Sequence, residues 1–153
     1  MELWHVPLRI GPAAVDRAAQ VLDAAELTRA ARFQRAIHRE AYIAAHAALR
    51  GILARALGLA PASLMFDTGP SGKPTLSAPI EPRMHFNLSH AGDHALVVLS
   101  AEGEVGVDLE GLPADGLEEL DAGIFSAHEI AAVAACPPAH RPLAPLRCWV
   151  GKE

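Results

Sequence analysis

The sequence predicts an α+β fold in which one long helix packs on a small antiparallel sheet. The alanine-rich stretch 26–57 repeats apolar residues at helical spacing. Three short segments with strand character, 84–89, 95–100 and 105–110, then follow one another with tight turns between them. The chain has 153 residues, of which 51% are hydrophobic and 20% charged, which is enough for one sizeable core and argues against disorder.

The long helix is expected to end near Leu57. Gly58 suits a C-terminal cap, and Pro61 cannot simply continue the helical pattern. A short helix over 61–64 and a short strand over 64–66 are expected next. The apolar residues on the core side of the long helix are Tyr42, Ala45, Leu49, Ile52, Leu53, Ala56 and Leu57.

The strand segments predict an antiparallel meander. Before them, the stretch 68–74 is dense in turn formers and presents Lys73 on a loop. After them, 111–123 is expected to be a loop or a short helical excursion. Ser126, with Glu129 three residues later, predicts the capped start of another helix. Four prolines between 136 and 145 exclude a regular helix there.

Composition and charge exclude several classes of protein. The formal net charge of −5 gives no support to nucleic-acid binding, and every apolar stretch is interrupted before the roughly 20 residues that a membrane span needs. The start of the chain lacks the basic residues of a secretory signal. Cys136 and Cys148 have neither CxxC spacing nor a partner pair. We therefore expect a cytoplasmic protein that binds neither nucleic acid nor membrane.

Two carboxylates are expected to converge at the end of the third strand segment. Strand alternation over 105–110 places Asp108 and Glu110 on one face and Val107 and Leu109 on the other. Repulsion between the two carboxylates is relieved by a cation, and hard oxygen ligands suit Mg²⁺. The alternative is a solvated face at the edge of the sheet, which is the better explanation of an Asp-x-Glu pair taken alone.

Polar donors are expected at the end of the first strand segment. Alternation sends Phe86 to the core and leaves Ser89 on the other face, with His90 at the strand end. The Ser89 hydroxyl and the His90 ring can bind a phosphate, although a capping serine and a surface histidine are the alternatives. A turn separates His90 from His94, so a helical zinc site is not expected.

Positive charge is available near these segments. Lys73 suits an anion, although a lone Gly-Lys-Pro turn is usually only a turn. Five arginines give the helical region a basic character, and a subset of them is expected to bind phosphate, although spacing alone does not select it. They are Arg29, Arg32, Arg35, Arg39 and Arg50.

Five motifs in order carry a family resemblance. The chain resembles the 4'-phosphopantetheinyl transferases of the surfactin-synthetase-activating type over roughly residues 26–153. One departure is Ala91, which stands where the family motif commonly has a second serine. The motifs are Gly72-Lys73-Pro74, Phe86-Asn87-Leu88-Ser89-His90, Gly106-Val107-Asp108-Leu109-Glu110, Phe125-Ser126-Ala127-His128-Glu129 and Trp149-Val150-Gly151-Lys152-Glu153.

The resemblance implies a reaction and its partners. The phosphopantetheine arm of coenzyme A would pass to a serine of an acyl or peptidyl carrier protein, releasing adenosine 3',5'-bisphosphate. The implied coenzyme A contacts are Lys73, Ser89 and His90, and the implied Mg²⁺ ligands are Asp108, Glu110 and Glu153. Lys152 is expected to contact phosphate or relay a proton. The base that takes the serine's proton stays open between Glu153 and a water on the metal.

The resemblance also predicts how the chain is organised. Family members have two similar lobes related by a pseudo-twofold, so residues 1–110 are expected to form the first lobe and 111–153 a linker with the incomplete start of the second. The sheet of a lone first lobe would leave an apolar face uncovered, which predicts self-association. The chain would then be a fragment, or regain a second lobe from another copy. The alternatives are a family-derived chain that only binds coenzyme A or a carrier, and an unrelated metal-dependent phosphohydrolase.

Overall fold

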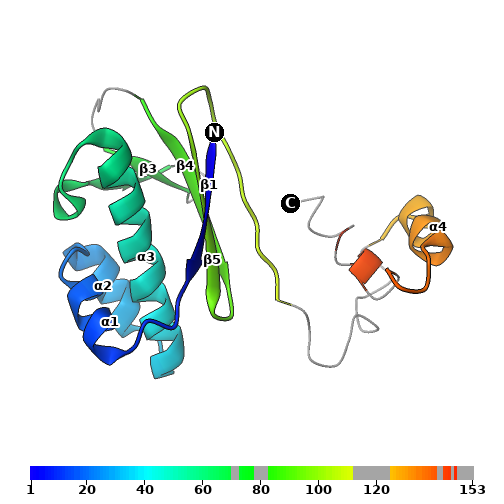
Figure 1. Ribbon diagram of the computed structural model, residues 1–153, viewed down its shortest axis with the longest axis horizontal. Helices are drawn as coiled ribbons and strands as arrows, with labels where there is room; N and C mark the ends of the chain where they lie inside the picture. Colours follow the sequence, from blue (N-terminus) through cyan, green and yellow to red (C-terminus); the bar gives the residue numbers. More distant parts are fainter. Residues whose placement is uncertain (70–72, 78–82, 112–124, 141–142, 146, 148–153) are drawn as a thin grey trace. The chain divides into compact units, whose positions relative to one another are not determined.

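Helices and two small antiparallel sheets make up the molecule, which confirms the predicted α+β class (Figure 1). The computed structural model describes residues 1–69, 73–77, 83–111, 125–140, 143–145 and 147. The chain divides into two compact units, Met1–Leu109 and Glu110–Glu153. The elements are β1 (Glu2–Pro7), α1 (Pro12–Ala19), α2 (Ala24–Ala31), α3 (Ala36–Leu57), the 3₁₀ turn η1 (Pro61–Ser63), β2 (Phe66–Thr68), β3 (Pro74–Leu76), β4 (His85–Ala91), β5 (His94–Ser100) and α4 (Ala127–Ala135).

The main sheet has the strand order β1-β5-β4, with antiparallel pairing throughout. Strands β4 and β5 confirm the predicted segments 84–89 and 95–100. The third strand is the N-terminal β1, which the sequence analysis did not predict. Strands β2 and β3 form a separate hairpin, in which the predicted strand over 64–66 is shifted to Phe66–Thr68.

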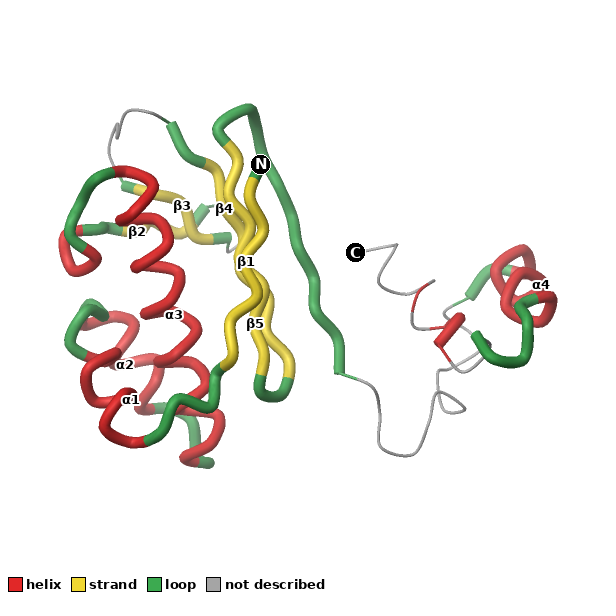
Figure 2. Tube along the Cα trace, viewed as in Figure 1, coloured by secondary structure: helices red, strands yellow, loops and turns green. Residues whose placement is uncertain are grey.

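The predicted third strand of the meander, 105–110, is wrong. These residues run in an extended conformation along the side of the main sheet that faces away from α3 (Figure 2). Two of their N–H groups donate to side chains of β4, Val107 to Asn87 and Leu109 to Ser89. Side-chain acceptors therefore take the place of a backbone ladder.

The long helix ends as predicted but does not begin as predicted. Gly58 caps α3 in the left-handed conformation, with φ of 67°, which glycine adopts without steric cost. The expected continuous helix from residue 26 is wrong, because α2 ends at Ala31 and α3 begins at Ala36. Glu26 and Arg50 would lie about 36 Å apart on one helix, yet their side chains are hydrogen-bonded at 2.8 Å.

The core of the first unit lies on both sides of α3. One cluster joins α3 to the sheet and to the chain before β2; its buried members are Leu49, Leu53, Ala54, Leu64, Phe86, Val97 and Leu99. A second cluster joins α3 to α1 and α2; its buried members are Val15, Leu22, Ala30, Tyr42 and Ile43. Helix α3 is therefore the central element against which the other helices and the sheet pack.

The second unit contains α4. The Glu129 N–H donates to the Ser126 hydroxyl and the Ser126 N–H to the Glu129 carboxylate, which confirms the predicted capped start. The motif 149–153, with Lys152 and Glu153, lies outside the described residues. In the part of the chain that the structure describes, no helix is long and apolar enough to cross a membrane.

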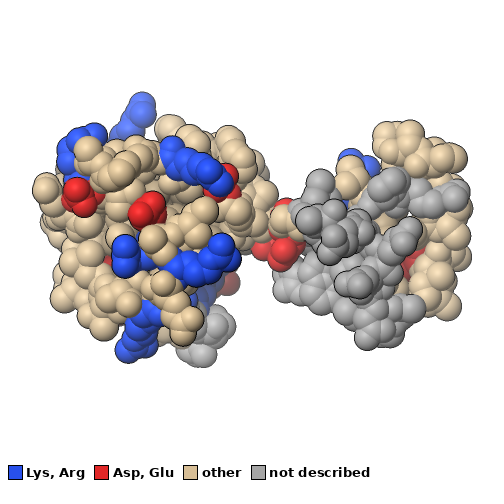
Figure 3. Space-filling model, turned by 90° about the horizontal axis from the view of Figure 1, so that it is seen from below, with Lys and Arg blue, Asp and Glu red and all other residues tan. Residues whose placement is uncertain are grey.

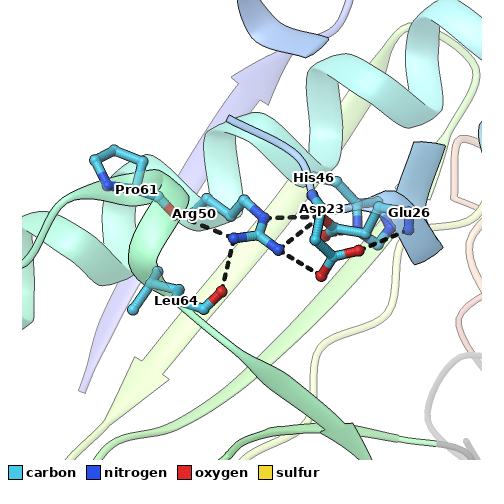
Figure 4. Close-up of polar contacts among 6 residues, drawn as sticks. All are labelled: Asp23, Glu26, His46, Arg50, Pro61 and Leu64. Atoms are coloured by element: carbon cyan, nitrogen blue, oxygen red, sulfur yellow. Dashed lines mark hydrogen bonds and ion pairs between the residues drawn. The ribbon is translucent and has the colours of Figure 1, made fainter. Parts of the chain in front are cut away.

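A fully buried arginine joins three segments of the first unit. Arg50 projects from α3, and its guanidinium donates to Glu26 at 2.8 Å and to Asp23 at 2.8 Å (Figure 4). It also donates to the carbonyl oxygens of Pro61 at 3.1 Å and Leu64 at 2.9 Å. One side chain thus ties the start of α2 to α3 and to the chain that leads into β2.

The two carboxylates of this network have further partners. Asp23 and Glu26 form a capping box at the start of α2, each accepting from the other's backbone N–H. Burial alone would raise the pKa of Glu26, but hydrogen bonds from His46 and the Asp23 N–H, together with the charge and hydrogen bond of Arg50, lower it below its ordinary value. Glu26 is therefore held ionised beside Arg50.

We expect Arg50→Met to destabilise the fold strongly, because it leaves Asp23 and Glu26 without their cation and two carbonyl groups without a donor. The expected loss is about 3 kcal/mol in the free energy of unfolding, measured by urea denaturation. Arg39→Ala is the matched control, since Arg39 is an exposed arginine of the same helix, and should change stability by less than about 0.5 kcal/mol. Equal effects of the two substitutions would contradict a structural role for the network.

Candidate functional site

The extended segment 105–109 lies beside β4 and brings two of the sequence motifs together. The Val107 N–H donates to the Asn87 side chain at 3.4 Å, and the Leu109 N–H donates to the Ser89 hydroxyl at 3.1 Å. Alternate residues of the segment, Val107 and Leu109, therefore pair with alternate residues of β4, Asn87 and Ser89. This register places Asp108 against the end of β4.

Ser89 and Asp108 are in direct contact. The Ser89 hydroxyl donates to Asp108 Oδ1 at 3.0 Å while it accepts from the Leu109 N–H. The hydroxyl thus uses its proton and one of its two lone pairs, which fixes its rotation. Ser89 therefore orients the carboxylate of Asp108.

The second carboxylate oxygen of Asp108 suits a cation. Asp108 Oδ2 is buried and has no hydrogen-bond partner among the described residues. An orphaned carboxylate oxygen is costly unless a cation or a donor meets it, and a hard oxygen ligand is what Mg²⁺ prefers. The donor chemistry therefore fits the predicted metal.

Among the residues that the structure describes, Asp108 is not brought together with the other two predicted metal ligands, Glu110 and Glu153. Glu110 is exposed and begins the second unit, so its convergence with Asp108 stays a prediction. Glu153 lies outside the described residues. Within the described ranges, no group of three or more His, Cys, Asp or Glu side chains is arranged to hold a metal.

Lys73 supports the start of the extended segment. Its ammonium donates to the Val105 carbonyl at 2.8 Å, and its own carbonyl accepts from the Gly69 N–H at 2.9 Å, which closes the loop between β2 and β3. An ammonium has three donors, so this contact leaves hydrogen-bonding capacity for an anion. Gly72 of the same motif lies outside the described residues.

His90 lies on the opposite face of β4 from Ser89. Successive residues of a strand point to opposite faces, and Phe86, which shares the parity of His90, is buried in the core against α3. Partial burial lowers the pKa of His90, and the positive charges of His46 and Arg29 lower it further. His90 is therefore influenced by basic groups of α3 and α2, whereas Ser89 is hydrogen-bonded to Asp108.

The structure narrows the set of arginines that can bind an anion. Arg50 is fully buried and committed to its network. Arg29 and Arg32, both on or next to α2, line an open pocket of about 830 Å³ with Thr28 and Phe33. On the face of the first unit drawn in Figure 3, Lys and Arg side chains lie at several separate places, with Asp and Glu side chains between them. Arg29 lines this pocket and also lowers the pKa of His90 through its charge.

The sequence analysis did not single out His46. The His46 Nδ1 atom lies 3.1 Å from Glu26 Oε1, and its ring stacks on Tyr42 with centroids 4.0 Å apart. The carboxylate and the stacked ring fix the orientation of the imidazole. The available signal was its position one helical turn before Arg50, which puts both side chains on the same face of α3.

Comparison with known proteins adds an independent finding. The family model described as 4'-phosphopantetheinyl transferase, N-terminal, matches residues 11–104. The chain is 34% identical to the 4'-phosphopantetheinyl transferase HetI of Nostoc sp. over 155 residues, covering 100% of this chain and 65% of HetI. It is 40% identical to the 4'-phosphopantetheinyl transferase AcpT of Salmonella typhi over 105 residues, 68% of this chain and 52% of AcpT. The chain thus spans between half and two thirds of these relatives.

The lowered pKa of His90 predicts a loss of stability in acid. The folded state favours the neutral ring, so protonation costs stability as the pH falls below the ordinary value of 6.5. Between about pH 7.5 and about pH 5.5, the melting temperature of the wild type should fall by more than that of His90→Gln. The lowered pKa of Glu26 contributes stability that is lost only below its ordinary value of 4.5, outside this window.

His38→Gln controls for the substitution itself, because His38 is an exposed histidine of α3. If His90→Gln lost as much stability in acid as the wild type, His90 would not be the group that senses pH.

Proposed function

Because the chain belongs to the 4'-phosphopantetheinyl transferase family, we propose that it transfers the phosphopantetheine arm of coenzyme A to a serine of an acyl or peptidyl carrier protein, releasing adenosine 3',5'-bisphosphate. The observation that carries this proposal is the contact between Ser89 and Asp108, because it unites two family motifs in one site. The same contact leaves Asp108 Oδ2 buried and open to a cation.

The site residues that the structure describes each have a role in this proposal. His90 and Arg29 bind phosphate oxygens of coenzyme A, since His90 lies within the electrostatic reach of Arg29 and a phosphate would offset their mutual repulsion. Lys73 holds the extended segment at Val105 and contacts the same ligand. Ser89 holds the Asp108 carboxylate in the orientation that the metal needs.

Mg²⁺ is part of the proposal, with Asp108, Glu110 and Glu153 as its ligands. Bound Mg²⁺ would neutralise the charge of the pyrophosphate as the carrier serine attacks. Lys152 is proposed to contact phosphate or relay a proton, and Glu153 remains a candidate for the base. The orphaned Asp108 oxygen supports the metal assignment.

We further propose that the chain is of the surfactin-synthetase-activating type and works in the cytoplasm. The order of the five sequence motifs supports the proposed type. We also propose self-association through the main sheet, because the apolar side chain of Leu3 on β1 is 62% exposed. A binding-only family member remains the second candidate, and the comparisons give no support to an unrelated phosphohydrolase.

The direct test is the intact mass of an apo carrier protein after incubation with the chain, coenzyme A and Mg²⁺. We expect a gain of one phosphopantetheinyl group. A version extended past Glu153, if the gene continues, distinguishes a site that needs a second lobe from one that does not. No gain with either version would favour the binding-only alternative.

The same assay tests the metal ligand. Asp108→Ala should reduce carrier modification by more than the roughly 10–100-fold that loss of an outer-shell partner costs, because it removes a ligand outright. Ser89→Ala should fall within that range, because it removes only the group that orients the ligand. Circular dichroism checks that both variants fold, and full activity of Asp108→Ala would remove Asp108 from the site.

A further inference from the structure

Two histidine rings from neighbouring strands meet on the first unit, on the face of the main sheet that also carries Ser89. His5 belongs to β1 and His94 to β5, and both are exposed. His5 Nε2 and His94 Nδ1 are hydrogen-bonded at 3.0 Å, and the ring centroids are 5.0 Å apart with the planes inclined by 29°. The two residues are 89 positions apart in the sequence, so only the folded sheet brings them together.

The backbone fixes the spacing of this pair. Strands β1 and β5 pair antiparallel, with Pro7 opposite His94 and His5 opposite Leu96, so the two histidines are diagonal neighbours on one face. It is the face away from α3, because Val6 and Ala95 pack with the core. Strand β5 is paired on both sides, which makes its end of the site rigid.

The nitrogen separation matches the span of a shared metal ion. With metal–nitrogen bonds of about 2.0–2.1 Å, two imidazole nitrogens lie about 2.8–3.0 Å apart at a right angle and about 3.3–3.4 Å apart at a tetrahedral angle. Neutral imidazole binds metal through either ring nitrogen and keeps its proton on the other. His5 can thus bind through Nε2 and His94 through Nδ1 without losing a proton.

We propose that His5 and His94 form a binding site for a divalent first-row transition ion, with water in the remaining coordination positions. Imidazole nitrogen favours Cu²⁺, Ni²⁺ and Zn²⁺, with Cu²⁺ bound most tightly, and disfavours Mg²⁺. The described residues supply no third His, Cys, Asp or Glu at this place, so the site is open and its ion exchanges with solvent. A bound ion links β1 to β5 and so stabilises the sheet that carries Ser89.

The test is a Cu²⁺ titration of the full chain, followed by electron paramagnetic resonance and by melting temperature. We expect about one equivalent bound with nitrogen hyperfine coupling from two imidazoles, and a rise in melting temperature that chelation reverses. His5→Gln and His94→Gln should each weaken Cu²⁺ binding by at least about 10-fold, because each removes a ligand and even loss of an outer-shell partner costs that much. His38→Gln and an excess of Mg²⁺ should leave binding unchanged.

Two outcomes would overturn the proposal. One is the absence of a two-nitrogen signal in the wild type. The other is unchanged Cu²⁺ affinity in His94→Gln, which would exclude His94 as a ligand. Neither outcome bears on the proposed transferase site, because that site uses different residues and a different ion.

Discussion

The first unit depends on the burial of one arginine. Arg50 is completely enclosed, and its guanidinium meets two carboxylates of α2 and two carbonyl groups of the chain that follows α3. A buried charge is tolerated only when it is paired and fully hydrogen-bonded, so these four partners must stay in place. The break between α2 and α3 and the path of the chain into β2 both follow from that requirement. Because Glu26 also holds His46, the network extends toward the basic groups near His90.

The candidate site is built on two faces of β4 by strand alternation. On one face, Asn87 and Ser89 accept from the backbone of the extended segment and so position Asp108. On the other face, His90 at the end of β4 experiences the charges of His46 and Arg29 from α3 and α2. An elongated anion that bridges the end of the strand could reach both sets of groups. Family membership and this arrangement support the same proposed ligand, coenzyme A.

Local patterns predicted well those elements that local interactions determine. The C-terminal end of α3, the β4–β5 hairpin and the cap of α4 each depend on residues close in sequence, such as Gly58 and the Ser126–Glu129 pair. The misses depend on distant residues or on side chains. The break before α3 depends on the contact between Arg50 and Glu26, and β1 depends on pairing with β5, far along the chain. The segment 105–109 is hydrogen-bonded to side chains of β4, which the alternation of apolar and polar residues does not predict. Asp108 and Ser89 were recognised from their motifs, whereas their mutual contact required the structure.

The central claim is that Asp108, Ser89 and His90 belong to a metal-assisted site for coenzyme A. Its most direct test is the melting temperature of the chain with coenzyme A, recorded with and without Mg²⁺, because a ligand that binds the native state must stabilise it. We predict a rise that requires both components and is lost in Asp108→Ala. An unchanged melting temperature with both present, or an equal rise in the absence of Mg²⁺, would contradict the claim.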